Sequence, residues 1–162
     1  MTHSNGFPHD GDAFMRLELL ISQLKYWRST IEKALVHARH THTFDDIVGM
    51  ILANRIIFFP YDDCFLVMEK VDYPRFSTFH CFLAGGEMTA VISHEAEMRE
   101  IGQKLGCKYL SIAGRKGWLR QLEQRGWRHV SSAMFIPIGE PDDEWRREGW
   151  GAENGDQAPQ RH

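Results

Sequence analysis

Three β-strand patterns follow one another closely in the middle of the chain, and they constrain its fold more than any other feature. They cover residues 56–60, 64–71 and 76–84, and each is rich in aromatic or β-branched residues. The short turns between them carry Asp and Pro, which favour turns. Strands joined by turns this short pair in antiparallel fashion. The pattern therefore predicts an antiparallel meander.

Two helices are predicted before the strands. Apolar residues recur at helical spacing over residues 13–37, which predicts a long amphipathic helix. After a polar linker, Thr43 stands three residues before Asp46, a spacing typical of a capping box. We expect the second helix to begin there and to end near Asn54.

Helical and strand patterns alternate after the meander. The pattern predicts a helix over residues 88–105, ended by Gly106. A strand over residues 107–114, a short helix from about Lys116 to Gly126 and a last strand over residues 129–139 follow. Helices on both sides of a meander indicate an α+β fold with a mostly antiparallel sheet.

Composition excludes several classes of protein. The chain has 162 residues, 43% of them hydrophobic, which suits one soluble domain with its own core. A net charge of -3 argues against a dedicated nucleic-acid-binding protein. We expect no membrane partner, because no apolar run reaches the ~20 residues of a span. The separated cysteines Cys64, Cys81 and Cys107 indicate buried free thiols, and the absence of a signal sequence predicts synthesis in the cytoplasm.

The two ends of the chain differ in composition from its middle. We expect a flexible N-terminal arm over residues 1–12, a domain over residues 13–139 and a polar C-terminal tail over residues 140–162. Trp145 and Trp150 stand out in that tail. Tryptophan is enriched among the residues that dominate protein interfaces, so both are candidates for partner binding. The alternative is that both fold back on their own domain.

The order of predicted elements resembles that of the GCN5-related N-acetyltransferases (GNAT). The most specific stretch is GCKYLSIAGRKGWLRQLEQRGWRHVSSAMFI, where a strand, a short helix and a Gly-Trp pair precede another strand. The resemblance covers residues 14–139 and implies a GNAT-like fold, with a mostly antiparallel central sheet flanked by helices. Members of this family bind acetyl-coenzyme A where a strand meets a helix N-terminus, whose free N–H groups hold the pyrophosphate.

The stretch CFLAGGEMTAV is the place where such a cofactor would bind. The family's loop usually reads Q/R-x-x-G-x-G/A, but here Phe82 takes the Gln or Arg position before Gly85. The carboxylate of Glu87 would repel a phosphate. A plain strand-to-helix turn is therefore favoured, and no cofactor is expected. If the chain were an active enzyme, the cofactor-binding residues would be Ala84, Gly85, Gly86 and Glu87.

The family's chemical residues are not matched either. Its usual general-acid Tyr corresponds to Leu122, which cannot donate a proton. Its usual Asn corresponds to Arg115 and its Ala to Trp118, whose bulk would fill space that coenzyme A needs. The resemblance therefore implies a fold without the chemistry, and no catalytic residue is expected.

Histidines near the end of the first predicted helix form one further candidate site. His37 and His40 are three residues apart and could share a metal ion with His42. No nearby Cys or carboxylate completes a ligand set in sequence. Positive charge at a helix C-terminus is the favoured interpretation, and no metal is expected.

Two more groups could act chemically. Glu69 and His80 lie on predicted strands, and either could serve as a general base, although a solvated sheet face is the commoner case. The second group consists of basic residues that could touch phosphates, although the favoured interpretation is that they form a solvated helix face. Its basic residues are Arg115, Lys116, Arg120, Arg125, Arg128 and His129.

A second resemblance concerns biological setting. FFPYDDCFLVMEKVDYPR, followed by a strand and LAGG, is similar to sequences of virion-associated proteins of tailed bacteriophages. It implies a non-enzymatic structural protein of the tail, the head-to-tail connector or the virion interior, in several copies against portal or tail-ring components. One alternative is an active acetyltransferase that transfers acetyl from acetyl-coenzyme A to an amine. Another is a cytosolic protein-binding module.

Overall fold

The computed structural model describes residues 10–113, 116–130 and 134–147. Two compact units divide the chain, Met1–Ser111 and Ile112–His162, and each is described here by itself. Their boundary falls inside the segment 13–139 that the sequence predicts as one domain. Most of the predicted N-terminal arm and much of the predicted tail lie outside the described residues.

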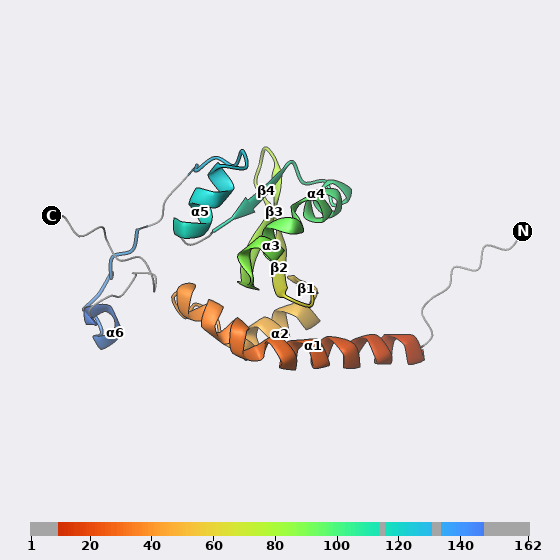
Figure 1. The fold of residues 1–162 in the computed structure, drawn as a ribbon. Coiled ribbons are helices and arrows are strands. Elements are labelled where there is room, and N and C mark those ends of the chain that lie inside the picture. Colours follow the sequence, from red (N-terminus) through yellow and green to blue (C-terminus); the bar gives the residue numbers. More distant parts are fainter. Residues whose placement is uncertain (1–9, 114–115, 131–133, 148–162) are drawn as a thin grey trace, which may run out of the picture. The chain divides into compact units, whose positions relative to one another are not determined.

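A four-stranded sheet forms the centre of the first unit, with the strand order β1-β2-β3-β4. The strands are β1 (Ile57–Pro60), β2 (Cys64–Asp72), β3 (Ser77–Gly86) and β4 (Tyr109–Ile112). β1 pairs with β2, and β2 with β3, in antiparallel fashion, which confirms the predicted meander. Figure 1 shows the long β2–β3 hairpin at the centre of this unit.

Helices cover both faces of the sheet. All residues of β2 from Cys64 to Met68 are buried, and successive strand side chains point to opposite faces. On one face, α1 (Asp10–His37) and α2 (Phe44–Leu52) enclose a core that contains Trp27, Ile31, Ile47, Phe65, Val67 and Leu83. α3 (Met88–Ser93) and α4 (Glu95–Lys104) pack on strands β2 and β3. The chain therefore has an α+β fold, as predicted.

A β-bulge changes the alternation of β3. Val67 pairs with Leu83 and Met68 pairs with Cys81, so Phe82 has no partner in the ladder. An extra residue in one strand shifts the side chains beyond it to the other face. Gly102 of α4 accordingly lies beside Phe79, whereas Gly85 lies against α1.

The helix ends agree with the capping signals in the sequence. Thr43 Oγ1 accepts a hydrogen bond from the Asp46 N–H at 3.1 Å, and the Asp46 carboxylate accepts one from the Thr43 N–H at 2.8 Å. This confirms the predicted capping box. The first helix begins at Asp10, so the last three residues of the predicted arm are helical. None of the helices in the described ranges is long and apolar enough to cross a lipid bilayer.

The predicted helix over residues 88–105 is two helices. α3 ends at Ser93 and α4 begins at Glu95, and the backbone of His94 between them (φ -90°, ψ 4°) departs from helical geometry. The His94 N–H donates to the Val91 carbonyl at 3.2 Å, a tighter turn than the α-helix uses. Gly106, with φ +80°, ends α4 as predicted, and the Cys107 N–H returns to the Gly102 carbonyl at 2.9 Å.

The second unit contains α5 (Lys116–Glu123) and α6 (Asp143–Arg146), the latter inside the predicted polar tail. The predicted last strand, 129–139, is wrong for its described residues, 129–130 and 134–139, which form no strand. Val130, Met134, Ile136 and Ile138 are almost fully exposed there. An apolar pattern makes a strand only where a neighbouring strand supplies hydrogen-bond partners.

Candidate functional site

The turn between β3 and α3 is the place where the resemblance would put a cofactor. The Glu87 N–H donates to the Asp63 carbonyl at 3.1 Å. That N–H is therefore used inside the protein. The side chain of Glu87, at the start of α3, makes no capping hydrogen bond. The turn thus offers a carboxylate and an occupied donor where a phosphate would need free N–H groups.

The two glycines of this turn serve close packing. A Cβ added at Gly85 would lie 2.6 Å from Phe65 Cε1 and 2.8 Å from Thr30 Cγ2, both too close for real atoms. Gly86 has φ +98°, and a Cβ there would overlap the Asp63 carbonyl oxygen. Glycine is thus required by the approach of β3 to α1 and to the start of β2. These contacts belong to a strand-to-helix turn.

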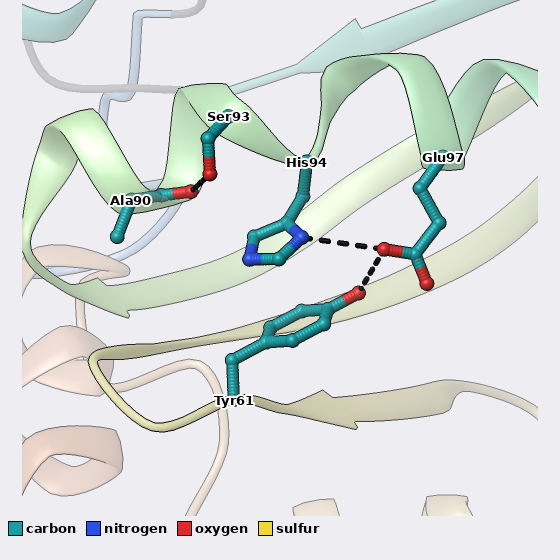
Figure 2. A network of polar contacts seen from close by, with 5 residues as sticks. All are labelled: Tyr61, Ala90, Ser93, His94 and Glu97. Carbon is teal, nitrogen blue, oxygen red and sulfur yellow. Dashed lines mark hydrogen bonds and ion pairs between the residues drawn. The ribbon is translucent and has the colours of Figure 1, made fainter.

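Three polar side chains from separate parts of the first unit converge, and we call them the Tyr61 cluster: Tyr61, His94 and Glu97 (Figure 2). Tyr61 lies in the turn between β1 and β2, where its N–H donates to the Cys64 carbonyl at 2.9 Å. His94 occupies the junction of α3 and α4, and Glu97 lies in the first turn of α4. The rings of Tyr61 and His94 are stacked, with centroids 3.5 Å apart and planes at 14°.

One carboxylate oxygen organises the Tyr61 cluster. Glu97 Oε2 lies 2.9 Å from the Tyr61 hydroxyl and 3.2 Å from His94 Nδ1. An ionised carboxylate only accepts hydrogen bonds, so a neutral His94 carries its proton on Nδ1. Burial first, and then the bond to Glu97, raise the pKa of Tyr61, which keeps the phenol a donor.

The other ring nitrogen of His94, Nε2, is the atom of the cluster that could take part in proton transfer. With Nδ1–H facing Glu97, Nε2 keeps its lone pair, and no described residue hydrogen-bonds to it. Such an imidazole can accept a proton. The described part of the chain holds no group of three or more His, Cys, Asp or Glu that could bind a metal ion.

Sequence patterns show little sign of the Tyr61 cluster. The only local signal is His94 three residues before Glu97, a spacing that places both on one side of a helix start. Tyr61 lies 36 residues before Glu97, and only the packing of α3 and α4 on the sheet brings it there.

A second polar row crosses three strands, and it unites two residues that the sequence singled out. Glu69 of β2 is the register partner of His80 of β3. His80 Nδ1 lies 2.8 Å from the Ser111 hydroxyl on β4. Burial lowers the pKa of His80, and the smaller effect of Glu69 opposes the shift. A neutral imidazole beside a hydroxyl can exchange a proton with it.

The three histidines predicted as a possible metal site, His37, His40 and His42, lie in different local surroundings. His37 ends α1, and His40 lies in the following turn with φ 53°. The His42 ring meets the Phe82 ring edge-on at 5.0 Å, and its Nδ1 lies 2.9 Å from Thr41 Oγ1. The three are not among any metal-binding group of the described residues.

Several predicted residues lie in the second unit. Leu122 is buried and Trp118 half-buried on α5, whereas Arg120, Arg125 and Arg128 are exposed. Gly85 belongs to the other unit, so obstruction of a coenzyme site by Trp118 stays a prediction.

The tail holds the two tryptophans that the sequence predicts as partner-binding residues, Trp145 and Trp150. Trp145 is half-buried in α6, where its backbone N–H donates to the Asp142 carboxylate at 2.8 Å. Arg115 and Trp150 lie outside the described residues.

Comparison with known proteins gives one structural likeness. No protein-family model matches the chain, and no curated protein matches it. A solved structure similar to this chain is that of an acetyltransferase from Trypanosoma brucei, at 13% identity and a TM-score of 0.42. The match covers 59% of this chain and 78% of that one. The proposals below depend on this chain's own contacts instead.

Proposed function

We propose that this chain is a non-enzymatic structural component of a tailed-phage virion, built on a GNAT-like scaffold. The observation that carries the proposal is the surface of α1. Its C-terminal half buries Leu24, Ile31 and Leu35 in the core. Its N-terminal half instead exposes Met15 (67%) and Leu19 (62%). Figure 1 shows that this half runs past the strands of the first unit.

The exposed apolar residues of α1 lie on more than one side of the helix. Met15 and Leu19 are four residues apart and share a face. Leu17 and Ile21, also exposed, form a second pair that points elsewhere on the helix. A helix that is apolar on several sides is stable when other surfaces bury it. We therefore assign the N-terminal half of α1 to contacts with partner proteins.

The turn at Gly85 supports the non-enzymatic part of the proposal. Its glycines are used for packing, and the Glu87 N–H is bonded to Asp63. Neither of the polar groups that could move protons, the Tyr61 cluster and the pair His80–Ser111, lies in that turn. An acetyltransferase needs its acyl donor held beside its chemistry.

The GNAT-like scaffold and the phage setting of the proposal are supported by separate observations. The observed order of two helices, three strands, a helical segment, a strand and a helix supports a GNAT-like scaffold. The stretch from Phe58 to Arg75, with LAGG after it, supports the phage setting through its resemblance to virion-associated proteins. In that setting the partners are portal or tail-ring proteins, met by several copies of this chain.

Incorporation into particles tests the proposal. Leu19→Lys places a charge in the α1 surface and should reduce the amount of this protein in purified virions at least tenfold. Lys33→Ala, an exposed change on the same helix, should leave incorporation unchanged. Trp145→Ala and Trp150→Ala should also lower it. Circular dichroism checks that each variant folds, and full incorporation of folded Leu19→Lys would contradict the proposal.

Calorimetry with acetyl-coenzyme A separates this function from the enzyme alternative. We expect no heat of binding when acetyl-coenzyme A is titrated into the purified full chain. Binding at micromolar strength would instead favour an acetyltransferase. A chain that binds neither acetyl-coenzyme A nor particles, but captures a host protein through α1, would be a cytosolic binding module.

A further inference from the structure

Three aromatic rings meet at the surface of the first unit, and we call them the aromatic patch: Tyr73, Phe76 and Tyr109. The rings of Tyr73 and Phe76 are 5.5 Å apart, and those of Phe76 and Tyr109 are 5.1 Å apart. They are 54%, 38% and 50% exposed, in that order. Contiguous exposed aromatic residues of this kind mark interaction sites.

The backbone beneath the aromatic patch is held in place before any partner arrives. The Tyr73 N–H donates to the Phe76 carbonyl at 2.8 Å and closes the β2–β3 turn. The Ser77 hydroxyl donates to the Asp72 carboxylate at 2.5 Å. The Lys108 N–H donates to the Ser77 carbonyl at 2.8 Å, which ties the start of β4 to this turn. A preorganised surface loses little entropy on binding.

Basic residues lie beside the aromatic patch, although the whole chain is acidic. Lys108 Nζ lies 5.5 Å from the centre of the Tyr109 ring. Arg75 is exposed in the turn itself. Lys70 Nζ lies 3.6 Å from the Asp72 carboxylate, so part of this positive charge is already paired. The patch therefore suits a partner with large apolar side chains and negative charge.

The C-terminal segment of this same chain has that chemistry. Residues 140–150 read EPDDEWRREGW, with acidic residues on both sides of Trp145 and a second tryptophan at Trp150. Tryptophan stacks on tyrosine and phenylalanine rings and on cations. No other segment of the sequence combines two tryptophans with this density of carboxylates.

We propose that the aromatic patch is the docking site for residues 140–150 of a second copy of this chain. The inference rests on the proposed function, because several copies in one assembly supply the second chain. A tail that binds a different surface on its neighbour makes a head-to-tail contact. Repeated contacts of this kind form a ring when the rotation from each copy to the next adds up to a full turn. The acidic residues pair with Lys70, Arg75 and Lys108 around the rings.

A mixing experiment with two double variants tests the docking. The patch variant Tyr73→Ser/Phe76→Ser keeps its tail, and the tail variant Trp145→Ser/Trp150→Ser keeps its patch. In sedimentation velocity, wild type should form assemblies larger than a dimer, and each variant alone should be a monomer. An equimolar mixture should form a 1:1 dimer and nothing larger, because each pair has one intact contact. Leu52→Ser, at another exposed apolar side chain, should assemble like wild type.

A fluorescent reporter gives a second measurement that does not depend on assembly size. Cys107 adjoins Lys108, and the other two cysteines are buried, so a thiol-reactive fluorophore can be placed beside the patch. When the tail variant carries this label, adding unlabelled patch variant should quench it through the incoming tryptophans. Adding unlabelled tail variant to the same labelled protein should leave the fluorescence unchanged. High salt should weaken the quenching.

The outcomes separate this inference from the proposed function. A monomeric wild type, or a mixture of variants that stays monomeric and unquenched, overturns the docking of a second copy. If that wild type still enters virions, the structural role stands without this contact. If wild type assembles through the patch but never enters particles, the docking stands and the virion role fails.

Discussion

His94 stacks on Tyr61 across two separate parts of the first unit, with ring centroids 3.5 Å apart. The contact joins the β1–β2 turn to the junction of α3 and α4. Both side chains also face the same oxygen of Glu97, so the stack and the two polar contacts fix one arrangement. These contacts hold the residue at the junction of the two helices from outside the helical segment.

The tautomer of His94 follows from that arrangement. We expect ¹⁵N NMR above the histidine titration range to show the proton on Nδ1, because the Glu97 carboxylate can only accept. Glu97→Ala should remove this preference. Tyr61→Phe is the control, since it keeps the ring stack and the bond between His94 and Glu97. A proton on Nε2 in the wild-type chain would contradict the assigned hydrogen bond.

Burial of His80 predicts a loss of stability in mild acid. Its pKa is lowered in the folded state by burial. As the pH falls through the ordinary value of 6.5, the unfolded chain takes up a proton before the folded chain does. The free energy of unfolding should therefore fall with pH until the folded-state pKa is reached, and should not change on this account above 6.5.

Urea denaturation at about pH 7.5 and about pH 5.5 measures this effect. His80→Gln, which keeps a polar group beside Ser111, should lose less stability between the two values than wild type. Glu69→Gln should lose more, because the Glu69 charge opposes the shift. Identical pH dependence in wild type and His80→Gln would show that another group controls acid sensitivity.

Close packing at Gly85 predicts a large cost for one added methyl group. Gly85→Ala places a Cβ against Phe65 and Thr30 and should lower the free energy of unfolding by about 1–3 kcal/mol. Gly49→Ala in α2 is the matched control, because its Cβ would meet nothing within 4 Å. Alanine is the better helix former, so this variant should gain about 0.5–1 kcal/mol. Equal denaturation midpoints for the two variants would contradict the packing described.

The three cysteines should react with a thiol reagent in a fixed order. Burial raises the pKa of Cys64 to about 11 and that of Cys81 to about 12. Only the thiolate is the nucleophile, so both should react slowly at mildly alkaline pH. Burial raises the pKa of Cys107 as well, but its side chain is only half-buried and therefore accessible, so it should react first. Mass spectrometry of peptides after timed labelling reads the order, and early labelling of Cys81 would show that β3 opens readily.

Local signals predicted much of the first unit. The meander, the capping box at Thr43 and the stop at Gly106 depend on residues close in sequence, and all were confirmed. The sequence alone showed no break at His94, and Tyr61, whose ring contacts His94 at that junction, reaches it only through tertiary packing. The strand predicted over residues 129–139 was wrong for the described residues 129–130 and 134–139, because an apolar pattern cannot show whether a partner strand is present.

The chain's own sequence determined most of the helices and strands of the first unit, because periodicity and capping act over a few residues. It also marked Glu69 and His80 as chemically notable. Only the tertiary structure decided that these two face each other beside Ser111, and that Tyr73, Phe76 and Tyr109 form one patch. Such neighbours depend on strand register and helix packing, which are set by contacts between residues far apart in the chain.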